Sequence, residues 1–128
     1  MKKTDWSFEI GPGALTLIGP AAWIEPFGQA WASWACHTAG WEVHLVQDAS
    51  LPAPDGPFFA ARPRFEDHRC LLEAPGFAGQ IVPLQGRALL QAHPAANLAD
   101  LSYFVRTAFA LQAFEQAALL FHAAGVVH

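Results

Sequence analysis

Residues 6–18 alternate between apolar and polar positions. Trp6, Phe8 and Ile10 occupy every second position, and the alternation resumes after the Gly-Pro-Gly sequence at residues 11–13. A repeat of two residues is the pattern of a strand with one buried face, and a glycine-proline break between two such runs is typical of a tight turn. The sequence therefore predicts a β-hairpin in this region.

A different spacing follows the hairpin. From residue 24 to residue 39 apolar residues recur every three or four positions, which predicts an amphipathic helix with Trp31 and Trp34 on one face. Gly40 stands where a glycine often terminates a helix with a positive φ angle. The alternation returns in residues 41–46, WEVHLV, which predicts a half-buried strand.

Prolines and glycines divide the middle of the chain into short segments. Residues 49–57, ASLPAPDGP, carry the strongest turn signal in the sequence and predict a loop within one domain. Residues 58–94 contain short apolar runs separated by turn-forming residues, which predicts an antiparallel meander. Pro63 and Pro83 are expected at strand edges or strand ends, because proline cannot donate a hydrogen bond to a neighbouring strand.

The last part of the chain combines a helical pattern with a final apolar run. Asn97 and Asp100 resemble a capping box, and the broad apolar stripe after them predicts a helix from residue 98 to about residue 116. Residues 118–128, ALLFHAAGVVH, are apolar apart from two histidines, and we expect a buried strand there. The whole pattern predicts a single α+β domain over residues 1–128, with a mostly antiparallel sheet and two helices.

Composition adds that the polar surface of this domain is small. The chain is 53% apolar and only 14% charged, whereas about 25% charge is typical of soluble proteins. A chain of this composition is expected to fold. Its small polar surface indicates either a large core or a face that contacts a partner or more of the same polypeptide.

Charge and hydropathy exclude two classes of partner. The net charge is −4 and the lysines and arginines are scattered, so we expect no nucleic-acid binding. The longest apolar run is about half the roughly 20 residues that span a bilayer, so we expect no membrane helix. The N-terminus, MKKTDWSFEI, lacks the apolar core of a secretory signal, and we therefore expect a cytoplasmic protein.

Candidate chemistry is sparse along the sequence. Metal ligands and carboxylates occur, but the spacings of the cysteines and histidines do not match structural zinc patterns, and the carboxylates alternate with arginines as on an exposed hairpin. The cysteines and histidines are Cys36, His37, His44, His68 and Cys70; the carboxylates are Glu66, Asp67 and Glu73, beside Arg62, Arg64 and Arg69. We therefore expect no catalytic residues, no metal ligands and no cofactor.

The final run carries a resemblance to a known family. ALLFHAAGVVH, preceded by a predicted helix with Arg106 and Leu111, resembles the segment that leads into the core of HPr serine kinase-like proteins, which share the nucleotide-binding core of phosphoenolpyruvate carboxykinases. The resemblance implies that residues 1–117 form an N-terminal recognition or docking region and that residues 118–128 form the first strand entering the P-loop kinase core. The motif G-x-x-x-x-G-K-[ST] does not occur, which implies truncation before the P-loop.

Two functions are therefore expected, with a third class left open. The resemblance implies a non-catalytic domain that recognises a protein or peptide substrate, or dimerises, for an HPr kinase-like enzyme. The alternative is a free-standing interaction module that homodimerises through its apolar C-terminal strand and helix; the third class is a small enzyme of unfamiliar type. Candidate interaction residues are Trp31, Trp34, Phe121 and His122, although core packing also accounts for the tryptophans, and a backbone-bonded buried histidine for His122.

Overall fold

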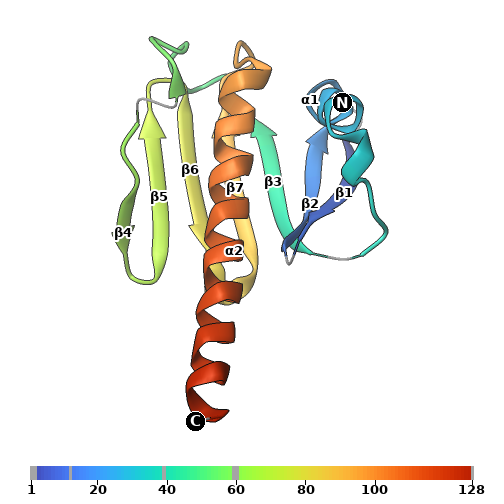
Figure 1. Ribbon diagram of the computed structural model, residues 1–128. Helices are drawn as coiled ribbons and strands as arrows, with labels where there is room; N and C mark the ends of the chain where they lie inside the picture. The colour runs from blue at the N-terminus through green and yellow to red at the C-terminus, as the bar shows by residue number, and fades with distance from the viewer. Residues whose placement is uncertain (1–2, 12, 39, 59–60, 128) are drawn as a thin grey trace.

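Seven strands form one mixed sheet in the computed structural model of the protein (Figure 1). The structure describes residues 3–127 except 12, 39 and 59–60, and in the C-terminal helix it describes side chains as far as residue 115. The strands are β1 (Lys3–Ile10), β2 (Gly13–Pro20), β3 (Trp41–Gln47), β4 (Arg64–Glu66), β5 (Arg69–Ala74), β6 (Phe77–Val82) and β7 (Arg87–Ala92). The helices are α1 (Ala21–Ala30) and α2 (Leu98–Val127), with short 3-10 helices η1 (Ala32–Trp34) and η3 (Pro83–Gln85).

The strand order is β1-β2-β3-β7-β6-β5-β4, and most neighbours are antiparallel. The two parallel pairs are β2 with β3, joined through α1, and β3 with β7, between which the β4–β5–β6 meander is inserted in sequence. This arrangement confirms the predicted α+β class, the N-terminal hairpin and the meander. Pro63 directly precedes β4 and Pro83 directly follows β6, as predicted.

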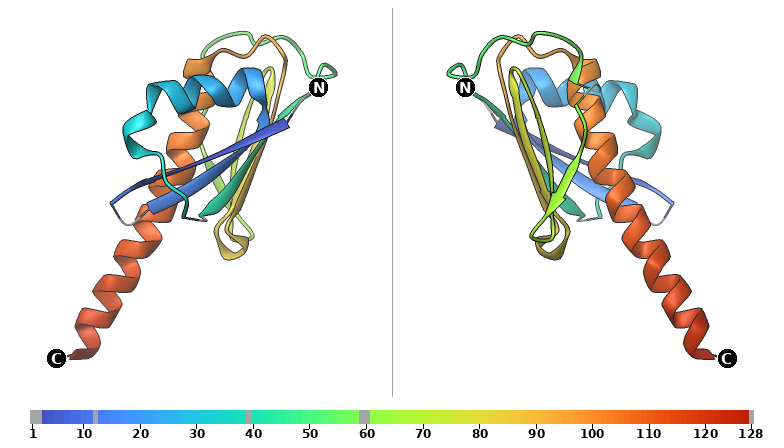
Figure 2. Two further views of the ribbon diagram at one scale, coloured as in Figure 1. Left: turned by 90° about the vertical axis from the view of Figure 1, so that its right-hand side faces the viewer. Right: turned by 90° about the vertical axis from the view of Figure 1, so that its left-hand side faces the viewer.

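Both helices cover the same face of the sheet, and the other face carries no helix (Figure 2). On the covered face, alternate strand residues such as Leu17, Val43 and Leu90 are fully buried. Gly79 marks how closely α2 approaches, because a Cβ atom added there would lie 2.5 Å from Cε1 of Phe104. The core is therefore a single layer between the sheet and the two helices.

The first helix is shorter than the sequence predicts. It ends at Ala30, and after η1 the chain turns extended and lies along β1, where the Cys36 N–H donates to the Ser7 carbonyl at 3.1 Å. The predicted helix to residue 39 was therefore wrong, because pairing with the sheet edge replaces the helical hydrogen bonds. Gly40 does not serve as the predicted helix cap. A Cβ atom there would lie 2.1 Å from the Ala14 carbonyl oxygen, so the glycine allows the two backbones to approach closely.

The start of α2 matches the prediction in part. The Asn97 side-chain oxygen accepts the Asp100 N–H at 2.9 Å, as an N-cap should. The Asp100 carboxylate does not complete a capping box; instead it accepts the buried N–H of Phe58 at 3.0 Å. Asp100 thus fastens the loop before β4 to the first turn of the helix.

The end of α2 differs from the prediction. The helix continues to Val127, so the strand expected over residues 118–128 is wrong as far as that residue; His128 lies outside the described residues. The physical reason is local. Residues 117–124 are rich in alanine and leucine, they follow a formed helix and contain no glycine or proline, so extending the helix is favoured over starting a new element. Among the described residues, no helix combines the length and apolar character needed to cross a bilayer.

We expect Asp100→Ala to lower the free energy of unfolding by about 1–3 kcal/mol, because it leaves the buried Phe58 N–H without an acceptor. Urea unfolding followed by circular dichroism measures this loss. Asp55→Ala is the matched control, since Asp55 is exposed on the same loop and should change stability by less than about 0.5 kcal/mol. Equal effects of the two substitutions would contradict the assigned role.

Candidate functional site: an aromatic pocket between β1, η1 and α2

An apolar pocket with a volume of about 250 Å³ opens between β1, η1 and α2. It lies on the side of the sheet that the helices cover, because its lining includes the buried side chain of Phe8. Aromatic and aliphatic side chains form nearly all of its wall, and one arginine lies at its rim. The lining residues are Phe8, Ile10, Trp31, Trp34, Val105, Arg106 and Phe109.

Phe8 organises the aromatic wall. Its ring packs edge-on against Trp31, with centroids 5.2 Å apart, and stacks on Phe109 at 6.2 Å. Phe8 is fully buried because it lies on the covered face of β1, opposite Leu15 of β2. The three rings therefore hold each other in place and fix the shape of this wall.

The two tryptophans predicted as interaction residues meet in this pocket. Their ring centroids are 6.1 Å apart, but they do not share a helix face as predicted: Trp31 caps α1, and Trp34 belongs to η1. Trp34 is 41% exposed and stands at the mouth, whereas Trp31 also packs on Phe27 in the core. The core-packing interpretation thus fits Trp31 better than Trp34.

The other two predicted interaction residues have a different outcome. The side chains of Phe121 and His122 lie outside the described residues, and their backbone belongs to α2 instead of a strand.

Sequence reasoning did not select the residues from β1 and α2 that complete the pocket. Val105 and Phe109 are four residues apart and therefore occupy the same side of α2, which is the signal that could have found them. Nothing in the sequence places that side of the helix against Phe8 and Trp34, because this contact depends on how α2 crosses the sheet.

Among the described residues, Arg106 is the only charged one in the lining. It is exposed, and within the part of the chain that the structure describes it makes no ion pair. A guanidinium at the rim of an apolar pocket can bind a carboxylate or phosphate in a bidentate manner while an apolar group fills the interior. The arrangement is suited to binding an amphipathic group.

The candidate metal ligands of the sequence are not assembled into a site. Nowhere in the described ranges do three or more histidine, cysteine or carboxylate side chains gather as metal ligands would. His44 lies on the open face of the sheet, where its Nε2 is 2.9 Å from Glu42 and 3.4 Å from an Arg87 nitrogen. Cys70 is buried in the core under the sheet, and burial raises the pKa of its thiol.

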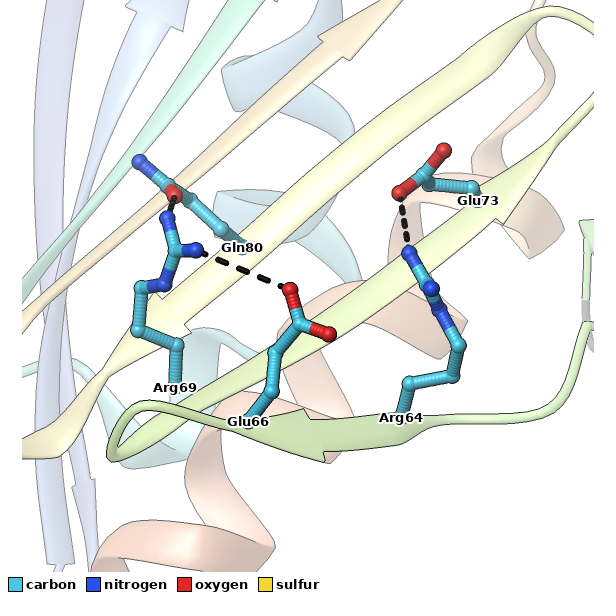
Figure 3. Close-up of polar contacts among 5 residues, drawn as sticks. All are labelled: Arg64, Glu66, Arg69, Glu73 and Gln80. Carbon is cyan, nitrogen blue, oxygen red and sulfur yellow. Dashed lines mark hydrogen bonds and ion pairs between the residues drawn. The ribbon is translucent and has the colours of Figure 1, made fainter.

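The carboxylates of the meander pair with its arginines on the open face of the sheet (Figure 3). Arg64 donates to Glu73 at 2.9 Å, and Arg69 lies 3.8 Å from Glu66 and donates to Gln80 at 3.3 Å. These side chains are largely exposed, so each pair contributes at most about 1 kcal/mol. The predicted mixed-charge hairpin is confirmed.

Comparison of the chain with protein-family models, with curated proteins and with solved structures found no significant match.

The two cysteines should differ strongly in reactivity. We expect Cys36, which is partly exposed, to react with Ellman's reagent in the folded protein at pH 8. Cys70 should react only on unfolding in urea, because burial blocks access and its raised pKa keeps it protonated as the pH rises through the range where an ordinary thiol ionises. In the Cys36→Ser variant the folded protein should therefore show almost no fast thiol. A fast thiol in that variant would contradict the buried position of Cys70.

Proposed function

We propose that this chain is a non-catalytic recognition domain that binds a protein or peptide partner through the aromatic pocket. The observation that carries the proposal is an apolar cavity, open to solvent and lined by two tryptophans and two phenylalanines. Tryptophan and arginine are among the residues most enriched at binding hot spots, and here Trp34 and Arg106 are both exposed and both line the pocket.

The chemistry of the lining indicates what the partner offers. A cavity of about 250 Å³ suits one large aliphatic or aromatic side chain, which would gain free energy by leaving water. Arg106 favours an acidic group next to that side chain, and the net charge of −4 of the whole chain disfavours acidic segments elsewhere on the surface. The proposed ligand is therefore a short segment with an apolar anchor beside an aspartate, a glutamate or a phosphorylated residue.

The resemblance of ALLFHAAGVVH supports a setting for this domain, namely the N-terminal region of an HPr kinase-like protein whose substrate protein would be the partner. The helical course of residues 118–127 does not add support, because the resemblance implies a strand there. A reading frame that continues past His128 into G-x-x-x-x-G-K-[ST] would support this setting. A stop codon immediately after His128 would contradict it, and the recognition proposal would stand on the pocket alone.

Selection of peptides from a random phage-displayed library on the full chain tests the recognition proposal. We expect enrichment of peptides with an apolar residue beside an acidic one. Trp34→Ala should lower the affinity for the best synthetic peptide by about tenfold or more, which is about 1.4 kcal/mol. Arg106→Glu should lower the affinity for acidic peptides selectively. Isothermal titration calorimetry measures both.

Val46→Ala is the matched control, because Val46 is an exposed apolar residue on the open face of the sheet, away from the pocket. The affinity of the Val46→Ala variant for the peptide should stay within twofold of the affinity of the unsubstituted chain. Failure to enrich any peptide, or equal affinity of the Trp34→Ala variant and the original chain, would overturn the proposal. Circular dichroism of each variant separates loss of binding from loss of the fold.

A further inference from the structure

A second apolar surface lies away from the aromatic pocket. Phe65 of β4, Leu84 of η3 and Phe114 of α2 are 71%, 79% and 71% exposed, the highest values among the large apolar side chains of the described residues. All three line one groove with a volume of about 450 Å³, whose floor includes Leu111 and the buried Cys70. Single exposed apolar residues are ordinary, but three from separate segments around one groove mark an interaction surface.

The groove borders the part of α2 that extends past the sheet. Leu111 and Phe114 belong to the groove, and the helix runs on to Val127, well beyond the strands (Figures 1 and 2). Between residues 117 and 127 the only polar residue in the sequence is His122. An apolar helix segment of this kind gains free energy by packing against another apolar surface.

We propose that the occupant of this surface is a second copy of the chain, packed with its α2 antiparallel to the first about a two-fold axis. The part of each helix from residue 114 to residue 127 is about 21 Å long at 1.5 Å per residue. Antiparallel pairing over this length brings residue 127 of one copy beside residue 114 of the other. Each helix end then covers the partner's groove, and the axis passes close to residues 120 and 121.

The rim of the groove is suited to self-association because it carries both charges. Glu66, Asp67 and Glu115 lie on it together with His68 and Arg69. A two-fold axis brings the same surface of both copies together, so a rim of one sign would repel itself and a mixed rim can pair.

This inference does not rest on the aromatic pocket, and either can fail without the other.

Sedimentation equilibrium of the full chain tests the dimer. We expect a dimer at micromolar concentration, with Phe114→Asp and Leu84→Asp each raising the dissociation constant at least about 30-fold, because a carboxylate would be buried in the groove. Leu98→Asp is the matched control: Leu98 is 39% exposed at the start of α2, far from the groove, and an aspartate is tolerated in a first helical turn. This variant should remain dimeric.

A crosslink tests the register independently of any destabilising substitution. In a Cys36→Ser background, Leu120→Cys should form an intermolecular disulfide on mild oxidation, whereas Thr107→Cys, well before the paired segment, should not. A monomer at every concentration would overturn the proposal, since the surface would then be covered by a different protein or by further polypeptide. A dimer that Phe114→Asp and Leu84→Asp leave intact would overturn it as well.

Discussion

The packing of α2 across one face of the sheet is the contact on which the rest of the structure depends. Phe104 lies directly over Gly79, so the helix sits as close to β6 as a backbone without a side chain allows. The same crossing brings Phe109 near Gly13, where a Cβ atom would lie 2.6 Å from Cε2 of the ring. Two glycines on different strands thus set the distance between the helix and the sheet. Gln112 fixes the helix further, because its side-chain oxygen accepts the Ala14 N–H at 2.9 Å.

Both surfaces proposed for binding follow from that crossing. On one side of the helix, Val105 and Phe109 form one wall of the aromatic pocket together with Phe8 of β1. Where it passes η3 and the β4–β5 turn, Leu111 and Phe114 form one side of the exposed groove.

The sequence predicted the secondary structure correctly where it depends on a local pattern. It failed where contacts with residues distant in the sequence determine the structure. Alternation identified the hairpin and β3, and prolines located the strand ends, because these signals depend on neighbouring residues only. The helix expected to residue 39 ended early because Cys36 pairs with Ser7, a contact across 29 positions. The last residues were expected to form a strand for their apolar character alone, without the alternation that identified the others. Trp34 was selected as a candidate by its type, but its neighbour Phe109 was not, since only the tertiary arrangement joins them.

The position of β7 beside β3 has a consequence for how the chain folds. Glu42 of β3 pairs with Arg87 of β7 near the centre of the sheet. The polypeptide between these two residues forms β4 to β6, which lie on the other side of β7. Closing so long a loop costs chain entropy before any central hydrogen bond is gained, so the two hairpin regions at either end should form first and join late. Until they join, β3 has an unpaired apolar edge. The slowest step of folding would therefore also be the one most exposed to aggregation.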